Sequence, residues 1–236
     1  MHLSRATLLS LVAVGLAAAA VIAAPVAGAR NGSGAPEAGS PPKSAYNYSL
    51  FAVSFASANV GWAAGTQATI IRTTDGGRHW VRQAKSLPPD RGSFTSVGAV
   101  SSKVCWAVGT FGIFKTVDGG KTWAQTARKL RPTALTMNTW QSVATAGSKV
   151  VWLASSLGDV AKSVNAGKTW TWQHRARSGI DAFGAIACNG SKHAWIPVDS
   201  VSTVYGRSVL TTADGIPLWA RWIAPASVPP TSGLLN

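Results

Sequence analysis

The sequence predicts an all-β protein built from about four repeated units, and three observations support this prediction. Four segments of similar sequence each end on a tryptophan, and the steps between these tryptophans are 43, 47 and 49 residues. Such steps suit a unit of four short strands. Outside the N-terminal segment, no stretch has the sustained apolar period of a helix. We therefore expect four antiparallel meanders that close at Trp80, Trp123, Trp170 and Trp219.

Residues 1–29 have the pattern of an export signal. Arg5 precedes an uncharged stretch rich in Leu, Val and Ala, which Pro25 and the small residues at 27–29 follow. This order is typical of a cleavable signal peptide, so we expect a periplasmic, cell-surface or extracellular protein. The alternative is an uncleaved anchor, because the apolar stretch approaches the roughly 20 residues that span a bilayer.

Composition divides the remainder of the chain into three parts. Residues 30–44 are rich in Gly, Pro and Ser, cannot bury enough apolar surface to fold, and are expected to form a flexible linker. The repeats occupy residues 45–224, and a C-terminal tail follows at 225–236. We expect the four units, or blades, at about 45–84, 92–128, 138–176 and 181–224.

The second unit shows its division into strands most plainly. Residues 94–100 alternate between apolar and polar side chains, as a half-buried strand does. Further strands are predicted at 103–109, 113–117 and 122–126, with Gly or Asp at the turns between them. The unit is therefore expected to be a four-stranded meander.

The turn between the third and fourth strands of each unit contains a short motif. In the second unit, Asp118 precedes two glycines and Trp123 closes the motif. The carboxylate can accept hydrogen bonds from the turn's N–H groups, the glycines can adopt positive φ, and the tryptophan can cover the hairpin. The third and fourth copies depart from this pattern, so we expect those hairpins to be less tightly specified. We assign structural roles to Asp75, Trp80, Asp118, Trp123, Asn165, Trp170, Asp214 and Trp219.

These residues resemble the Asp-box, or bacterial neuraminidase repeat. The longer segments GWAAGTQATIIRTTDGGRHW and CWAVGTFGIFKTVDGGKTW are similar to the propellers of the photosystem II stability and assembly factor family. The resemblance implies a β-propeller-like fold, and the repeats predict about four blades, fewer than the propellers of assembly factors and sialidases have. Three arrangements stay open: an open or incomplete ring, a closed four-bladed ring in which the stretch around Tyr46 completes the last blade, and a fragment of a longer ancestral chain.

The acidic residues restrict the catalytic interpretations. Asp-box propellers include sialidases, but a sialidase pairs a Tyr nucleophile with a Glu, and the sole Glu of this chain, Glu37, lies in the linker. Other glycoside hydrolases need two carboxylates about 5 to 10 Å apart. Asp159 and Asp199 are the candidates, because both are expected in turns between second and third strands, and the alternative for them is a solvated loop position. The histidines are isolated in the sequence, and we expect no catalytic residue, no cofactor and no metal ion.

The two cysteines occupy different repeat positions. Cys105 directly precedes the tryptophan of its strand, whereas Cys188 lies seven residues before the corresponding tryptophan. A disulfide requires Cα atoms within about 7 Å. We therefore expect two buried free thiols, although export would permit a disulfide.

The distribution of charge indicates a binding surface. The chain has 22 basic and 8 acidic residues, a formal net charge of +14. Basic residues recur after each closing tryptophan, in the fourth strand and the following connector. Successive turns of a meander alternate ends, so the connectors share one face with the turns between second and third strands, opposite the Asp-boxes. We expect this face to bind through Arg82, Lys85, Arg91, Arg128, Lys129, Arg131, Arg175, Arg177 and Arg221.

Two functional hypotheses follow. The first is an exported, non-enzymatic binding or assembly module, similar to a photosystem II assembly factor, that holds an acidic protein segment or other polyanion. The second is a degenerate glycan-binding or glycoside hydrolase-type propeller, for which Trp140 and Trp172 are the candidate sugar-stacking residues. Export argues against nucleic acid as the partner. Association with a membrane surface, and pairing of copies through open blade edges, are further expectations.

Overall fold

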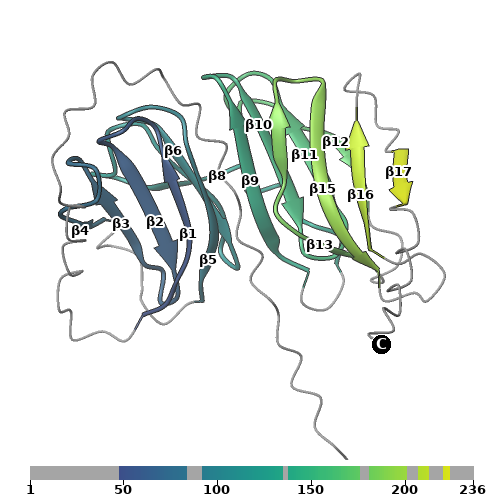
Figure 1. The fold of residues 1–236 in the computed structure, drawn as a ribbon, viewed down its shortest axis with the longest axis horizontal. Coiled ribbons are helices and arrows are strands. Elements are labelled where there is room, and N and C mark those ends of the chain that lie inside the picture. The colour runs from purple at the N-terminus through teal and green to yellow at the C-terminus, as the bar shows by residue number, and fades with distance from the viewer. Residues whose placement is uncertain are drawn as a thin grey trace, which may run out of the picture.

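The computed structural model describes residues 48–83, 92–134, 138–175, 181–200, 207–212 and 220–223. Within these ranges the chain forms seventeen strands (Figure 1). No helix in the described residues has the length and apolar character needed to cross a bilayer. The predicted signal, the linker and the C-terminal tail lie outside the described residues.

The strands form four antiparallel sheets that follow one another along the chain. Sheet 1 contains β1 (Leu50–Phe55), β2 (Gly61–Gly65), β3 (Ile70–Thr73) and β4 (Val81–Arg82). Sheet 2 contains β5 (Phe94–Ala99), β6 (Cys105–Gly109), β7 (Gly112–Thr116) and β8 (Ala124–Thr126). Sheet 3 contains β9 (Trp140–Ala146), β10 (Val150–Ser155), β11 (Val160–Ser163) and β12 (Thr171–His174). The strands of sheet 2 lie within two residues of the predicted bounds.

Sheet 4 departs from the simple meander because the first strand of its unit is in two pieces. Both pieces pair with the same central strand, before and after an interruption in which the N–H of Gly184 donates to the C=O of Pro197 at 2.9 Å. The sheet therefore has five strands instead of four. They are β13 (Asp181–Phe183), β14 (Ala187–Asn189), β15 (His193–Ser200), β16 (Arg207–Thr212) and β17 (Ala220–Ile223).

The sheets pack face to face in chain order, as the blades of a propeller do. Apolar clusters lie between sheets 1 and 2, between sheets 2 and 3, and between sheets 3 and 4. Figure 1 shows sheet 1 at one end of the described arc and sheet 4 at the other. The propeller-like, all-β fold is therefore confirmed, and the described sheets do not close into a ring.

The closed four-bladed arrangement is wrong. It required the stretch around Tyr46 to complete the last blade, and Tyr46 itself lies outside the described residues. The strand that follows it, β1, instead pairs with β2 in sheet 1, with Val53 opposite Ala63. The antiparallel hairpin places this strand in the first blade, and the two ends of the arc stay apart.

A cation and a tryptophan join each of the first three sheets to the next. In sheet 2, Lys115 lies directly across the strand pair from Trp106, with its Nζ 4.7 Å from the ring centroid. The same Nζ donates to the C=O of Ala166 in sheet 3 at 3.0 Å. We call this arrangement the interblade clamp. It recurs as Arg72 over Trp62, donating to Ser102, and as Lys162 over Trp152, donating to Ser191.

The clamps place charge close to the apolar interfaces. Burial lowers the pKa of Lys115, and the nearby Lys168 lowers it further. Burial also lowers the pKa of Lys162. The ring face and the carbonyl oxygen stabilise these cations, because they replace part of the hydration that burial removes.

Candidate functional site

The connector between sheets 2 and 3 presents three basic side chains to solvent. Arg128, Lys129 and Arg131 are exposed, whereas Leu130 between them packs against the core of these two sheets. The N–H of Leu130 donates to the C=O of Ala127 at 2.8 Å, which closes a tight turn. The half-buried leucine therefore fixes a segment of backbone from which three cations extend outward.

A stack of aromatic and guanidinium groups lies beside this connector. Trp140 donates its Nε1–H to the C=O of Leu130 at 3.3 Å and stacks on Trp172, with 6.0 Å between ring centroids. The guanidinium carbon of Arg175 lies 4.0 Å from the centroid of Trp172, and its Nη1 donates to the C=O of Arg131 at 3.3 Å. The stack brings Arg175 next to the connector. We call Arg128, Lys129, Arg131 and Arg175 the connector patch.

The same stack covers the rings of Trp140 and Trp172, which are therefore not available to bind sugar as predicted. Trp140 is buried, with 2% of its surface exposed. Trp172 is half-buried, and Trp140 and Arg175 already stack on its ring. Neither ring offers the open face that a sugar needs, so these tryptophans pack the structure.

Asp159 lies at the centre of the hydrogen bonds beneath the connector patch. It is fully buried, and its carboxylate accepts bonds from the N–H of Thr133 at 2.6 Å and from the hydroxyl of Thr133 at 2.8 Å. The side-chain amide of Asn138 donates to it at 2.8 Å, and Nε of Arg175 lies 3.6 Å away. One buried carboxylate thus fixes the connector and orients an arginine of the patch.

The candidate acid pair is not assembled in the expected way. Asp159 lies in the predicted turn, between β10 and β11, but its carboxylate has no exposed surface for a substrate to reach. Asp199 lies within β15 instead of in a turn, and its backbone pairs with Ala182 and Arg207. The predicted turn position of Asp199 is wrong, because the central strand of sheet 4 continues through it.

The remaining residues of the predicted basic face are only partly described. Arg82 is half-buried and donates to the C=O of Gln67 at 3.4 Å, which places the first connector beside a turn between second and third strands. Arg221 lies in β17, where only the backbone is described. Those outside the described residues are Lys85, Arg91 and Arg177, together with the fourth-copy motif residues Asp214 and Trp219.

The Asp-box turns are held by a local network. In sheet 2, Asp118 accepts hydrogen bonds from the N–H of Thr122 at 3.0 Å and from the Thr122 hydroxyl at 2.6 Å. The buried Thr116 donates its hydroxyl to Asp118 at 2.8 Å and accepts from the N–H of Gly120 at 2.8 Å. The sequence motif identified the aspartate but missed this threonine. A Thr or Ser two residues before the aspartate, repeated in each unit, was the available signal.

The third Asp-box has the same geometry as the first two, although it contains Asn165 in place of aspartate. Its Oδ1 accepts from the N–H of Thr169 at 2.8 Å, and its Nδ2 donates to the Thr169 hydroxyl at 2.7 Å. The hydroxyl of Ser163 donates to Oδ1 at 3.0 Å. The third hairpin therefore keeps the hydrogen bonds of the first two, because an amide oxygen also accepts them.

The Asp-boxes predict a pH dependence of stability. Hydrogen bonds from Thr122 lower the pKa of Asp118 from 3.8 to about 2, and those from His79 lower the pKa of Asp75 further. A carboxyl with a lowered folded-state pKa adds stability above its unfolded pKa and loses that stability as pH falls through the folded value. We expect urea midpoints to fall between pH 4 and pH 2 less steeply in the double variant Asp75→Asn, Asp118→Asn than in the wild type.

The wild-type third turn supports this choice of substitution, since asparagine there keeps the hydrogen bonds without titrating. All other carboxyl groups are common to both proteins, so the difference between their pH profiles isolates the two Asp-boxes. Parallel profiles over this pH range would contradict the assignment.

The described cysteines form no disulfide. Cys105 is buried as expected, and its burial raises its thiol pKa. Cys188 is half-buried instead of buried, and burial raises its pKa to about 11. Both thiols are therefore protonated at neutral pH and unreactive.

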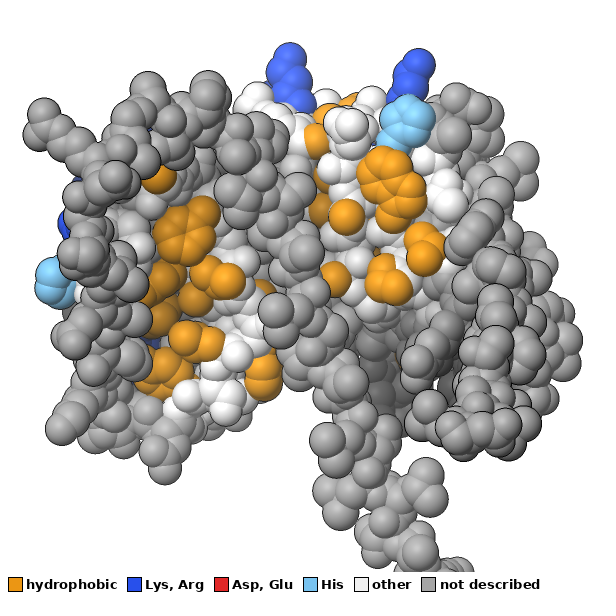
Figure 2. Space-filling model, viewed as in Figure 1, with side chains coloured by type: hydrophobic (Ala, Val, Ile, Leu, Met, Phe, Trp, Pro, Cys, Tyr) orange, Lys and Arg blue, Asp and Glu red, His pale blue; other side chains and the backbone are white. Residues whose placement is uncertain are grey.

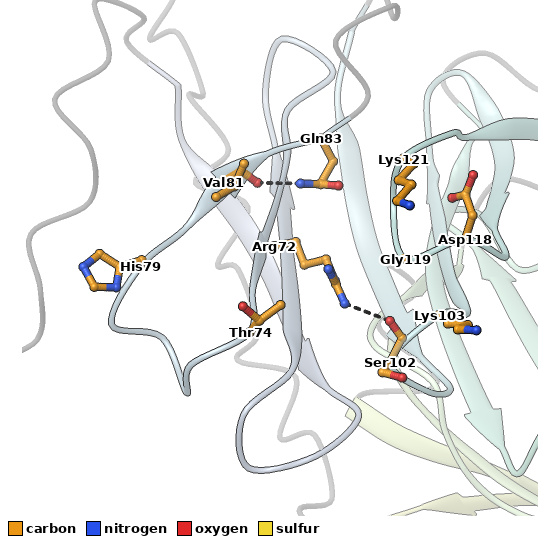
Figure 3. A pocket seen from close by; sticks show the side chains of 10 residues that line it. All are labelled: Arg72, Thr74, His79, Val81, Gln83, Ser102, Lys103, Asp118, Gly119 and Lys121. Atoms are coloured by element: carbon orange, nitrogen blue, oxygen red, sulfur yellow. Dashed lines mark hydrogen bonds between the residues drawn. The ribbon is translucent and has the colours of Figure 1, made fainter.

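A separate hollow of about 580 Å³ lies at the Asp-box end, between sheets 1 and 2 (Figure 3). Arg72, Lys103, Lys121 and Asp118 are among the residues that line it. Figure 3 shows Arg72 extended toward Ser102, so the interblade clamp forms part of its wall. Within the described part of the chain, no group of three or more His, Cys, Asp or Glu side chains could hold a metal ion.

Comparison with known proteins gives a family match and several similar structures. The family model described as photosynthesis system II assembly factor YCF48 matches residues 43–208. No curated protein has a matching sequence. The structure of YCF48 from Cyanidioschyzon merolae is similar at a TM-score of 0.57 and 20% identity, over 75% of this chain and 57% of that chain.

Two further structures are similar. The GH74 xyloglucanase from Xanthomonas campestris has a TM-score of 0.55 at 16% identity, over 74% of this chain and 30% of that chain. A structure described as YCF48 bound to D1 peptide has a TM-score of 0.48 at 16% identity, over 77% and 84% of the two chains, which is too low to compare binding surfaces. The chain spans little more than half of the Cyanidioschyzon protein and less than a third of the xyloglucanase. Identities this low establish a shared fold and no shared activity.

Proposed function

The chain belongs to the family of photosynthesis system II assembly factor YCF48, and from this premise we propose that it is a non-catalytic module that binds a protein partner. The partner segment is acidic, and the connector patch is the surface that binds it. The observation that supports this proposal most directly is that Arg128, Lys129 and Arg131 are exposed on a connector whose half-buried Leu130 packs against the core.

A fixed connector backbone favours binding because less backbone freedom is lost when the partner arrives. The connector is tied to the core by Leu130 and to Asp159 through Thr133. Arg175 adds a fourth positive charge, and its side chain is 44% exposed although it lies near the buried Asp159. The carboxylates of an acidic segment can therefore pair with these exposed guanidinium and ammonium groups.

A non-catalytic role agrees with the surroundings of the candidate acids. Asp159 is buried among donors that hold the connector, and the family match is to an assembly factor. The similarity to a GH74 enzyme is one of fold at 16% identity. We give no glycan-active function to the described residues, because neither Trp140 nor Asp159 offers an open surface.

We also propose that the protein is exported, on the basis of the signal-like pattern of residues 1–29. The N-terminal sequence of the protein recovered from its host tests this. A mature chain beginning at Arg30 supports cleavage, and an intact N-terminus in the membrane fraction supports the anchor.

Charge reversal of the connector patch tests the binding surface. We expect the triple variant Arg128→Glu, Lys129→Glu, Arg131→Glu to bind a fluorescent poly-glutamate peptide roughly thirtyfold more weakly than the wild type, because each reversal removes an attraction of a few tenths of a kcal/mol and adds a repulsion. Fluorescence anisotropy at several salt concentrations measures this. Wild-type affinity should fall steeply with salt, and the affinity of the variant should fall less.

A matched triple reversal at the opposite end of the blades is the control. Lys149, Lys168 and Lys192 are exposed in turns on the Asp-box side, and their replacement by glutamate changes the net charge equally. If both triple variants lose affinity to the same extent, only net charge matters and the connector patch is not the site. Equal affinity of the wild type and the connector variant would exclude it as well.

A further inference from the structure

Each of the first three sheets uses its two faces differently. One face, which we call the forward face, contains the tryptophan of the second strand and packs on the following sheet: Trp62, Trp106 and Trp152 occupy this position. The opposite, backward face receives the preceding sheet. In sheet 2 it contains Val97, Ala107 and Phe114, which lie side by side across three strands.

Sheet 4 has a forward face with no sheet on it among the described residues. Trp195 occupies the position of the clamped tryptophans, yet 40% of its surface is exposed. Across the strand pair lies Thr211, where the other sheets have Arg or Lys, and His193 stacks on the ring with 6.3 Å between centroids. Pro197 is exposed on the same side of β15.

Sheet 1 is the first of the four described sheets, so no described sheet packs on its backward face. Val53, Ala63 and Ile71 lie across its three strands in the same register as the backward face of sheet 2. Ala63 and Ile71 are buried, and the exposed part of this face is on β1, where Val53 is 51% exposed and Phe51 and Phe55 are also exposed. Figure 2 shows hydrophobic side chains gathered over this sheet and, separately, over β15 beside a histidine.

We propose that these two faces bind each other between two copies of this chain, with the forward face of sheet 4 in one copy packed on the backward face of sheet 1 in the other. The contact repeats the sheet-to-sheet interface that occurs three times within the chain. Because each copy has one face of each kind, two copies close head to tail with both faces covered, giving eight sheets. The pairing uses sheet faces, whereas the sequence suggested blade edges.

The match between the two faces favours a second copy as the occupant. One face presents Trp195, and the other presents the exposed apolar side chains of β1, Phe51, Val53 and Phe55. Consecutive sheets within the chain likewise meet through the tryptophan of one sheet and apolar side chains of the next. A second copy buries apolar surface that a monomer leaves exposed.

Sedimentation velocity of the full chain at high salt, over a wide range of concentration, tests the proposal. High salt screens association driven by the net charge. We expect the wild type to sediment with twice the mass of its protomer. Val53→Asp, which places a charge on the backward face, and Trp195→Asp, which places one on the forward face, should each give a monomer. Val117→Asp is the matched control, because Val117 is exposed in the Asp-box turn of sheet 2, away from both faces, and its variant should stay dimeric.

A mixture of the two monomeric variants tests the head-to-tail geometry. Each retains the face that the other has lost, so equimolar Val53→Asp and Trp195→Asp proteins should form a heterodimer through one intact interface. If one single variant stays dimeric, the contact joins two identical faces and the proposal is wrong. A wild type that is monomeric at all concentrations, or a dimer unaffected by both substitutions, also overturns it. Circular dichroism spectra matching the wild type show that the variants are folded.

Discussion

Replacement of Trp106 by alanine should lower the free energy of unfolding by about 3 to 5 kcal/mol, the range found for large aromatic side chains in cores. Trp106 is almost fully buried between sheets 2 and 3 and meets Trp170 edge to face, with 6.0 Å between centroids. The substitution also removes the ring beneath Lys115, whose Nζ then loses its cation–π partner. Urea unfolding followed by circular dichroism measures the change.

Lys115→Met separates the packing of the ring from the charge of the clamp. Methionine keeps the apolar stem over Trp106 but removes the charge and the bond to the C=O of Ala166. We expect a loss of about 1 kcal/mol, the net value of one hydrogen bond. If Lys115→Met costs as much as Trp106→Ala, the charge and not the buried ring holds the two sheets together, and our account of the clamp is wrong.

Replacement of Asp159 by alanine is expected to lower the free energy of unfolding by about 3 kcal/mol, because several hydrogen-bond donors lose their common acceptor. The N–H of Thr133 and the amide of Asn138 both donate to this carboxylate, which is fully buried. The connector patch depends on the same bonds. The variant should therefore also bind poly-glutamate more weakly than the wild type, since the cations are no longer held in place. Urea unfolding and anisotropy measure the two effects.

Arg175→Gln is the control for this prediction. The Arg175 side chain is 44% exposed and its Nε lies 3.6 Å from the carboxylate, so loss of the ion pair should cost less than about 1 kcal/mol. The loss of unfolding free energy for Asp159→Asn should fall between these two values. The amide oxygen of asparagine still accepts from Thr133, but its NH2 group faces other donors. A cost for Arg175→Gln equal to that for Asp159→Ala would show that the ion pair, and not the hydrogen-bonded connector, is the stabilising element.

Local sequence was enough to predict the repeated sheets. Strands alternate with period two, and the Asp-box is a turn whose donors and acceptors lie within four residues of one another, as Asp118 and Thr122 do. Both signals are therefore visible in short windows of sequence. The third turn shows the limit of such reasoning. Asn165 departs from the sequence motif, yet it accepts the same hydrogen bond from a backbone N–H as Asp118 does.

The site could be predicted only in outline. The basic residues after each closing tryptophan were visible, and the structure brings Arg128, Lys129, Arg131 and Arg175 together. The role of Asp159 was not visible, because its donor Thr133 is 26 residues away and reaches it only when the connector folds back over sheet 3. An aspartate expected to be solvated, or to act as an acid, is instead a buried support for the patch.

The sequence by itself determined the number of repeats, the sheets they form and the local bonds of the turns, since each depends on residues a few positions apart. Tertiary structure alone decided how one sheet meets the next. Lys115 reaches Ala166 across 51 residues, and Thr211 lies across the strand pair from Trp195, where the tryptophans of the other sheets have a cation. These contacts depend on the register and stacking of whole sheets, which place distant residues against each other, and no short sequence pattern records that placement.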